Sequence, residues 1–210
     1  MPYDALLFDL DGTLVDTETV ALTTGMAAFA AMGHPVDRAF MQLLVGVDLP
    51  TAAGIIGAAL PTLDQKGLQA HWHSAFSAAI DESLPLKPGA LSLLSARHRP
   101  MALVTSSGQA EAHHKLRVTG LAVHFDTVVT LADVTRPKPA PEPYLLAAER
   151  LGVAPARCLV FEDSEAGAEA AHRAGCTVVQ VPDIGPVSGL WAHLQARDLL
   201  EGARLAGLGV

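Results

Sequence analysis

The stretch ALLFDLDGTLVDTE, residues 5–18, decides the expected fold. It begins with the run ALLFDL, which has the length and hydrophobicity of a strand buried on both faces. Two carboxylates, Asp9 and Asp11, stand one residue apart at the end of this run. Carboxylates gathered in this way repel one another unless a divalent cation lies among them. The stretch therefore predicts a core strand whose end carries an acidic site.

Most of the remaining chain alternates between strand-like and helix-like segments. Apolar runs of strand length show little polar alternation, and segments with helical start and stop residues lie between them. The strand-like runs are 5–10, 101–105, 127–131, 157–161 and 176–181, and the helical segments are 89–97, 108–118, 141–151, 164–174 and 188–206. Such alternation with parallel crossovers predicts an α/β fold with a doubly wound, Rossmann-like parallel sheet.

Residues 16–84 break this alternation, because they contain no convincing strand. They are rich in Ala, Leu and Met, and glycines and prolines divide them into four expected helices. These helices are expected at 17–32, 37–45, 51–59 and 64–81. We therefore expect two domains: an α/β core of residues 1–15 and 85–210, and an all-α helical-bundle cap of residues 16–84 inserted after the first strand.

The composition of the chain argues against several classes of protein. Hydrophobic residues make up 50% of the 210 residues and charged residues 17%, which is typical of a globular protein. The net charge of −8 argues against a nucleic-acid-binding surface, and no apolar run approaches the roughly 20 residues that span a bilayer. The N-terminus lacks the basic region of a signal peptide. Cys158 and Cys176 lie in apolar runs and are predicted to be buried free thiols. We expect a cytoplasmic protein, a monomer or weak homodimer, with no nucleic-acid or membrane partner.

Polar residues follow the predicted strands at the points where the strands end. The carboxyl ends of parallel strands form the ligand crevice of an open α/β sheet, so these residues are expected to converge. Oxygen-rich ligands favour Mg²⁺, while hydroxyls and an ammonium can hold phosphoryl oxygens. One carboxylate can attack phosphorus, and a second can transfer protons. The converging residues are Asp9, Asp11, Thr105, Ser106, Ser107, Lys138, Glu162 and Asp163.

With these residues in place, the chain resembles the haloacid dehalogenase (HAD) superfamily, in the branch of phosphatases and β-phosphoglucomutases with a helical cap. Four motifs carry the resemblance, in the order in which the family has them. They are FDLDGTLVDTE at 8–18, LVTSS at 103–107, RPKPAPEPY at 136–144 and VFEDSEAG at 160–167. A calcium-binding loop also begins D-x-D, but Leu14 and Val20 stand where that loop needs glycine and glutamate.

The resemblance implies a role for each matching residue. Asp9 would be the nucleophile and a metal ligand. Asp11 would be the general acid/base, and its backbone carbonyl would also bind the metal. Thr105 and the backbone of Ser106 would bind the transferring phosphoryl group. Lys138 would neutralise charge on the nucleophile and on the phosphate.

The resemblance also implies the remaining ligands. Asp163 would bind Mg²⁺, and Glu162 would do so directly or through water. The loop Val45-Gly46-Val47 would be the specificity loop of the cap and would face the leaving group. Asp16 and Glu18 stay open between a solvated helix start and a contact with substrate.

Features that distinguish the branches of the family indicate which reaction this chain catalyses. Dehalogenases of the superfamily lack the second aspartate, so Asp11 favours phosphoryl chemistry. Mutases carry cations in the cap that bind a second phosphate, whereas the only Lys or Arg residues of residues 16–84 are Arg38 and Lys66. Leu49 stands where mutases have arginine. We expect a Mg²⁺-dependent phosphatase that hydrolyses a small phosphorylated metabolite, a sugar phosphate or a phosphoglycolate-like compound, through an aspartyl-phosphate. A β-phosphoglucomutase-type phosphomutase is the alternative. A phospho-acceptor signalling domain is a third hypothesis, which the order of the motifs disfavours.

Overall fold

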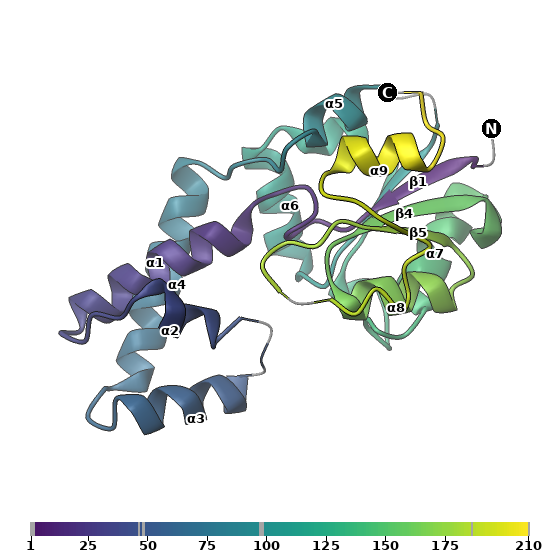
Figure 1. Cartoon of the computed structure of the whole chain (residues 1–210). Helices are drawn as coiled ribbons and strands as arrows, with labels where there is room; N and C mark the ends of the chain where they lie inside the picture. Colours follow the sequence, from purple (N-terminus) through teal and green to yellow (C-terminus); the bar gives the residue numbers. More distant parts are fainter. Residues whose placement is uncertain (1–2, 46, 48, 97–98, 186, 210) are drawn as a thin grey trace. The chain divides into compact units, whose positions relative to one another are not determined.

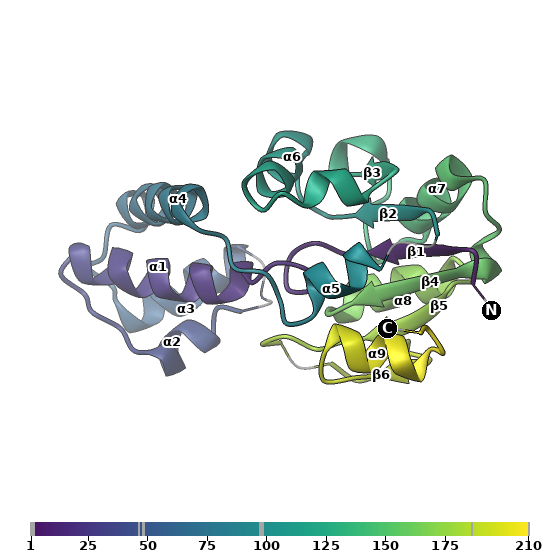
Figure 2. The ribbon, with the colours of Figure 1, turned by 90° about the horizontal axis from the view of Figure 1, so that it is seen from above.

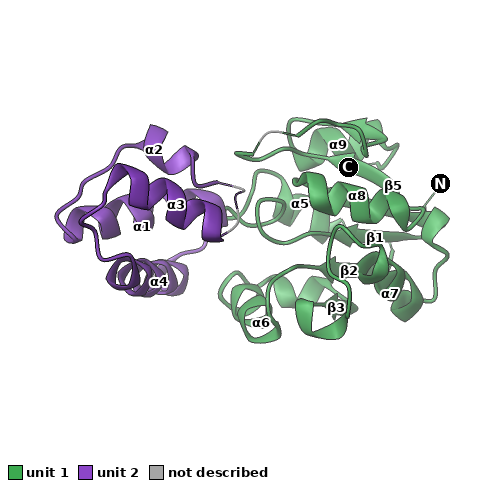
Figure 3. Cartoon of the chain, turned by 90° about the horizontal axis from the view of Figure 1, so that it is seen from below, with its two compact units in different colours: residues 1–16, 85–210 green, residues 17–84 purple. Residues whose placement is uncertain are grey.

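The computed structural model describes residues 3–45, 47, 49–96, 99–185 and 187–209. The chain divides into two compact units (Figure 3). The core unit comprises residues 1–16 and 85–210, and the cap unit comprises residues 17–84. Among the described residues, none of the helices is long and apolar enough to cross a membrane.

The described residues of the core unit form a six-stranded parallel sheet in the order β3-β2-β1-β4-β5-β6 (Figure 2). The first strand lies between β2 and β4, and Phe8 pairs in register with Leu103 on one side and Phe161 on the other. In chain order, β2 and β3 therefore lie on one side of β1, and β4, β5 and β6 lie on the other. The strands are β1 (Ala5–Phe8), β2 (Met101–Val104), β3 (Thr127–Val129), β4 (Cys158–Glu162), β5 (Thr177–Gln180) and β6 (Leu194–Gln195).

Helices cover both faces of this sheet (Figure 1). Small residues of α7 and α8 pack on one face, against side chains that include Leu7 and Val160. On the other face, Phe8 stacks on Phe161 with ring centroids 5.1 Å apart, and Gly202 of α9 lies against Val179 and Phe161. Burial on both faces explains why the strands have apolar runs without alternation. The helices are α5 (Ala90–Ser95), α6 (Gln109–Val118), α7 (Glu142–Leu151), α8 (Glu165–Arg173) and α9 (Leu199–Leu205), with 3₁₀ turns at Leu121–His124, Leu131–Asp133 and Pro155–Arg157.

In the part of the cap unit that the structure describes, all the regular structure is helical. Its helices are α1 (Thr17–Ala31), α2 (Arg38–Gln42), α3 (Leu49–Ala59) and α4 (Gln65–Glu82). Helices α1 and α4 approach closely at Gly25, where a Cβ would lie 2.7 Å from the ring of Trp72. The Trp72 indole N–H donates to the Ala21 carbonyl at 3.1 Å, and Phe29 packs edge-to-face on Phe40. These contacts form the small core of the unit.

Two chain segments connect the units, and within the core unit they run side by side. Val15 pairs with Leu86 in an antiparallel bridge, and the Asp16 amide donates to the Pro85 carbonyl at 2.8 Å. The Lys87 amide donates to the Leu14 carbonyl at 2.9 Å. Backbone pairing thus fixes where both connections join the core unit.

The prediction of a helix over residues 188–206 is wrong over its first half. Leu194 and Gln195 form β6 beside β5, and the helix begins only after Asp198, whose side chain accepts from the Glu201 amide at 2.8 Å. The pairing of β6 with Val179 and Gln180 is tertiary, so the local pattern of residues did not contain it. The prediction for Cys158 and Cys176 is confirmed, because both are buried free thiols.

Candidate active site

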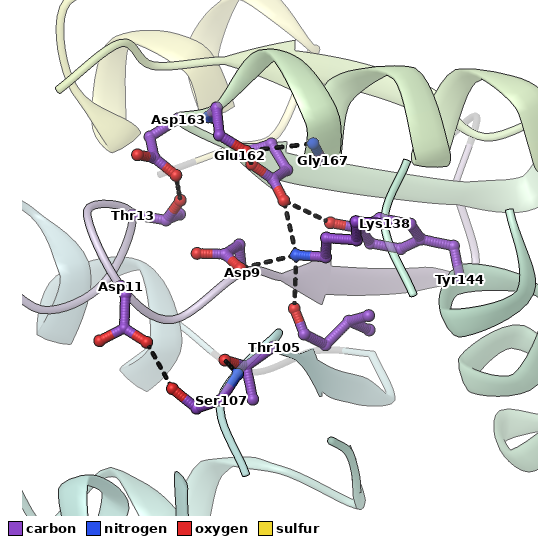
Figure 4. Close-up of polar contacts among 12 residues, drawn as sticks. Asp9, Asp11, Thr13, Thr105, Ser107, Lys138, Tyr144, Glu162, Asp163 and Gly167 are labelled. Carbon is purple, nitrogen blue, oxygen red and sulfur yellow. Dashed lines mark hydrogen bonds and ion pairs between the residues drawn. The ribbon is translucent and has the colours of Figure 1, made fainter. Parts of the chain in front are cut away.

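Lys138 joins the ends of three central strands (Figure 4). Its Nζ donates to Asp9 Oδ1 at 2.6 Å, to Glu162 Oε1 at 2.6 Å and to the Val104 carbonyl at 2.9 Å. The side chain is only 5% exposed, and its ammonium lies 5.2 Å from the centre of the Tyr144 ring. The proline-rich loop before α7 therefore delivers one buried cation to two buried carboxylates.

Glu162 holds Lys138 in this position. It is fully buried, and it accepts hydrogen bonds from the Tyr144 hydroxyl at 2.9 Å and from the Ser164 amide and hydroxyl at 3.0 and 2.9 Å. Gly167 makes room for it, because a Cβ at Gly167 would overlap the Glu162 carboxylate. Both carboxylate oxygens are thus hydrogen-bonded by the protein. Its predicted role as a Mg²⁺ ligand stays a prediction.

Asp163 meets the loop that follows β1. Its Oδ1 accepts from the Thr13 hydroxyl at 3.1 Å. Gly12 has φ +84°, and a Cβ there would overlap Asp163 Oδ2, so the turn needs glycine on both counts. The motifs at 8–18 and 160–167 are therefore in direct contact.

Three acidic residues can hold a metal ion together. Asp9, Glu162 and Asp163 each offer a carboxylate oxygen, and these atoms lie within 4.8 Å of one another. Hard divalent cations such as Mg²⁺ bind oxygen ligands of this type. The donor chemistry of the residues present therefore fits a divalent cation.

The electrostatics of the site support the same conclusion. Burial, together with the carboxylates of Glu162 and Asp11, raises the pKa of Asp9 to about 7, against the opposing effect of Lys138. Burial and the carboxylates of Glu162 and Asp9 raise the pKa of Asp163 to about 9. Burial alone would lower the pKa of Lys138, but the two carboxylates that it contacts raise it above its usual value. With Asp9, Glu162 and Asp163 all ionised, the site would hold more negative charge than Lys138 compensates, and a divalent cation would balance that excess.

Asp11 lies apart from the three acidic residues, beside the end of β2 (Figure 4). Its Oδ2 accepts from the Ser107 hydroxyl at 2.9 Å, and its Oδ1 accepts from Lys115 Nζ at 2.7 Å. Burial by itself would lower the pKa of Lys115, but Asp11 and Glu111 raise it. Sequence reasoning missed Lys115, because a lysine within a predicted helix carries no local sign that it points inward.

Thr105 and Ser106 lie where β2 ends. Thr105 is buried, and its hydroxyl accepts from the Ser107 amide at 3.0 Å, which shapes the turn into α6. Ser106 is exposed. Backbone N–H groups at such a helix start suit a phosphoryl group.

The predicted specificity loop belongs to the cap unit. Val45 borders a cavity of about 160 Å³ together with Glu18 and Trp72. Val47 lines a second cavity of about 510 Å³, which is mostly apolar and also includes Trp72. Gly46 lies outside the described residues. The role of this loop toward a leaving group stays a prediction.

The family model for haloacid dehalogenase-like hydrolases matches residues 6–181 of this chain. The chain belongs to this family. A phosphorylated carbohydrates phosphatase of Thermotoga maritima is 35% identical over 176 residues, which are 82% of this chain and 82% of that protein. A fructose-1-phosphate phosphatase of Escherichia coli is 36% identical over 190 residues, which are 85% of this chain and 96% of that protein. A crystal structure of a HAD family hydrolase from Deinococcus radiodurans R1, with bound phosphate and sodium, has a TM-score of 0.83 at 29% identity and covers 98% of this chain and 96% of that chain.

These similarities place the chain in the phosphatase and β-phosphoglucomutase-like branch of the superfamily. It is a phosphatase, an enzyme that hydrolyses phosphoric monoesters. The predictions of family, fold class and enzyme class are confirmed.

Proposed function

We propose that this phosphatase hydrolyses small phosphorylated carbohydrates with Mg²⁺, through an aspartyl-phosphate formed on Asp9. The observation that carries the proposal is the pairing of a buried Asp9 with Lys138, beside Asp163. The substrate class is supported by the relatives that act on phosphorylated carbohydrates and on fructose 1-phosphate.

The geometry supports a division of labour between the two aspartates. Lys138 holds Asp9 Oδ1, and the second oxygen of Asp9 points away from Lys138 (Figure 4). That oxygen attacks phosphorus, and the bond from phosphorus to the ester oxygen breaks. Asp11 enters this step in its protonated form and gives that proton to the departing oxygen, so the sugar leaves as an alcohol.

Water then regenerates the enzyme. Asp11, now a carboxylate, takes a proton from a water molecule whose oxygen attacks phosphorus. The bond between phosphorus and Asp9 breaks, which releases inorganic phosphate and restores the Asp9 carboxylate. Lys138 stays charged throughout and stabilises Asp9 each time it is ionised.

Backbone donors stabilise the transferring group, and the carboxylates would hold the metal beside it. Asp9, Asp163 and the Asp11 carbonyl would hold Mg²⁺, which supplies positive charge to the phosphoryl oxygens when it is bound. Thr105 and the backbone of Ser106 bind the remaining oxygens. Between residues 16 and 84 the only Lys or Arg residues are Arg38 and Lys66, which favours a substrate with one phosphate over a bisphosphate.

A substrate panel tests the proposal. Phosphate release is measured from fructose 1-phosphate, glucose 6-phosphate, β-glucose 1-phosphate and phosphoglycolate, with Mg²⁺ and with EDTA, for the wild type and Asp9→Asn. We expect release from the sugar phosphates that both EDTA and Asp9→Asn abolish. Metal-independent turnover or an active Asp9→Asn would contradict the mechanism. A clear preference for phosphoglycolate would contradict the substrate class. Isomerisation of β-glucose 1-phosphate without phosphate release, dependent on a sugar bisphosphate, would identify a mutase instead.

A further inference from the structure

Lys115 is a buried lysine that contacts a residue of the proposed reaction. It lies on α6, its side chain is only 4% exposed, and its Nζ donates to Asp11 Oδ1 at 2.7 Å. The same ammonium contacts Ser107 Oγ at 3.2 Å and Glu111 Oε1 at 2.5 Å. A charged group in this position needs paired partners, because an unpaired buried charge is costly. Asp11 is one of those partners.

The two contacts hold both oxygens of the Asp11 carboxylate. Lys115 donates to Oδ1, and the Ser107 hydroxyl donates to Oδ2 at 2.9 Å. A carboxylate has about four acceptor positions, so two remain available. The Asp11 side chain is 29% exposed, which leaves it open to substrate and water while Lys115 stays covered. Lys115 is therefore placed to act on the reaction through Asp11, the partner that is open to substrate.

We propose that Lys115 is a positioning residue, which together with Ser107 fixes the Asp11 carboxyl group in the orientation from which its protonated form gives a proton to the leaving oxygen. This inference rests on the proposed acid/base role of Asp11. Without the two contacts the Asp11 side chain would distribute among its staggered rotamers. A displacement of about 1 Å can cost a factor of about 10² in rate, and general acid catalysis supplies about 10²–10⁴. Loss of Lys115 should therefore cost a factor of about 10–100 where protonation matters.

A comparison of two phosphate esters, one that needs protonation of its leaving oxygen and one that does not, isolates the effect of Lys115 on proton transfer. An alkyl phosphate such as a sugar phosphate needs protonation of its leaving oxygen, whereas 2,4-dinitrophenyl phosphate releases a stable anion without it. The value of kcat/KM covers binding and the first phosphoryl transfer, so it excludes the later hydrolysis of the aspartyl-phosphate. We expect Lys115→Met to lower kcat/KM by about 10–100-fold on the alkyl phosphate and less than about threefold on the dinitrophenyl ester. Ser107→Ala, which removes little volume, should likewise lower the ratio of kcat/KM on the alkyl phosphate to kcat/KM on the dinitrophenyl ester.

Two control variants make the outcomes distinct. Glu111→Gln alters the partner of Lys115 that does not take part in the reaction, so it should leave the ratio unchanged. Asp11→Asn should reproduce the selective loss on the alkyl phosphate. If Asp11→Asn slows both esters equally, the proposed acid role of Asp11 fails. If Asp11→Asn is selective but Lys115→Met and Ser107→Ala slow both esters equally or neither, the positioning role of Lys115 is refuted.

Discussion

Gly167→Ala should destabilise the protein, although alanine is the better helix former. Gly167 lies in α8, and a Cβ there would overlap the Glu162 carboxylate, which has no room to move without losing its partners. Those partners are Lys138, the Tyr144 hydroxyl, and the amide and hydroxyl of Ser164.

The magnitude follows from these contacts. Breaking a buried ion pair by removing one partner costs about 3–5 kcal/mol, and each hydrogen bond to a charged group contributes about 1.5–3 kcal/mol. Replacing glycine with alanine within a helix returns about 1 kcal/mol. We expect a net loss of about 2–4 kcal/mol, since Glu162 shifts rather than disappears. For a chain of this size that loss lowers Tm by roughly 5–15 °C.

Thermal unfolding followed by circular dichroism measures this loss. Gly54→Ala is the matched control, because Gly54 also lies within a helix, α3, and a Cβ there meets no atom within 4 Å among the described residues. It should leave Tm unchanged or raise it slightly. If Gly167→Ala melts at or above the wild-type temperature and retains its kcat, the Glu162 carboxylate does not need the space that Gly167 leaves.

Two further predictions concern the charges of the site. Lys138→Met should lower kcat by at least about 10²-fold in the phosphate-release assay, because Asp9 loses the cation that stabilises its ionised form. Urea unfolding should show that the free energy of unfolding falls by about 3–5 kcal/mol. Activity within a few-fold of wild type would contradict this role of Lys138. The metal-free protein should lose stability as pH rises from about 4 to 9. The pKa of Asp9 is raised to about 7 and that of Asp163 to about 9, both from 3.8, so the folded state holds protons that the unfolded state has released. Tm measured in EDTA should therefore be lower at pH 8 than at pH 5.5, and this difference should be larger in the wild type than in Asp163→Asn. Addition of Mg²⁺ should raise the Tm of the wild type at pH 8. An equal pH dependence of Tm in both proteins would contradict the prediction.

The sequence predicted the sheet and the acidic cluster because both depend on local patterns. The apolar runs at 101–105 and 157–161 have the length and composition of buried strands, and they form β2 and β4. Parallel strands bring their carboxyl ends to one edge, so Asp9, Glu162 and Asp163 could be expected to meet. The motif order added the identity of the family.

What the sequence did not predict depends on tertiary contacts. Lys115 faces Asp11 because of the rotation of α6 about its axis, which the packing of the helix determines. Glu162 was expected mainly as a metal ligand, and its hydrogen bonds to Tyr144 and Ser164 depend on how α7 and α8 meet β4. The strand β6 exists only through its pairing with β5.

Trapping the phosphorylated enzyme tests whether Asp9 is the nucleophile. The wild type and Asp9→Asn are mixed with a radiolabelled sugar phosphate and Mg²⁺, quenched in acid within milliseconds, and digested for mass spectrometry after borohydride reduction. An acyl-phosphate on Asp9 would appear as a label sensitive to hydroxylamine and, after reduction, as homoserine at position 9. We expect this product in the wild type and none in Asp9→Asn. Phosphate release at the wild-type rate with no labelled enzyme, or a label on any other residue, would contradict the account.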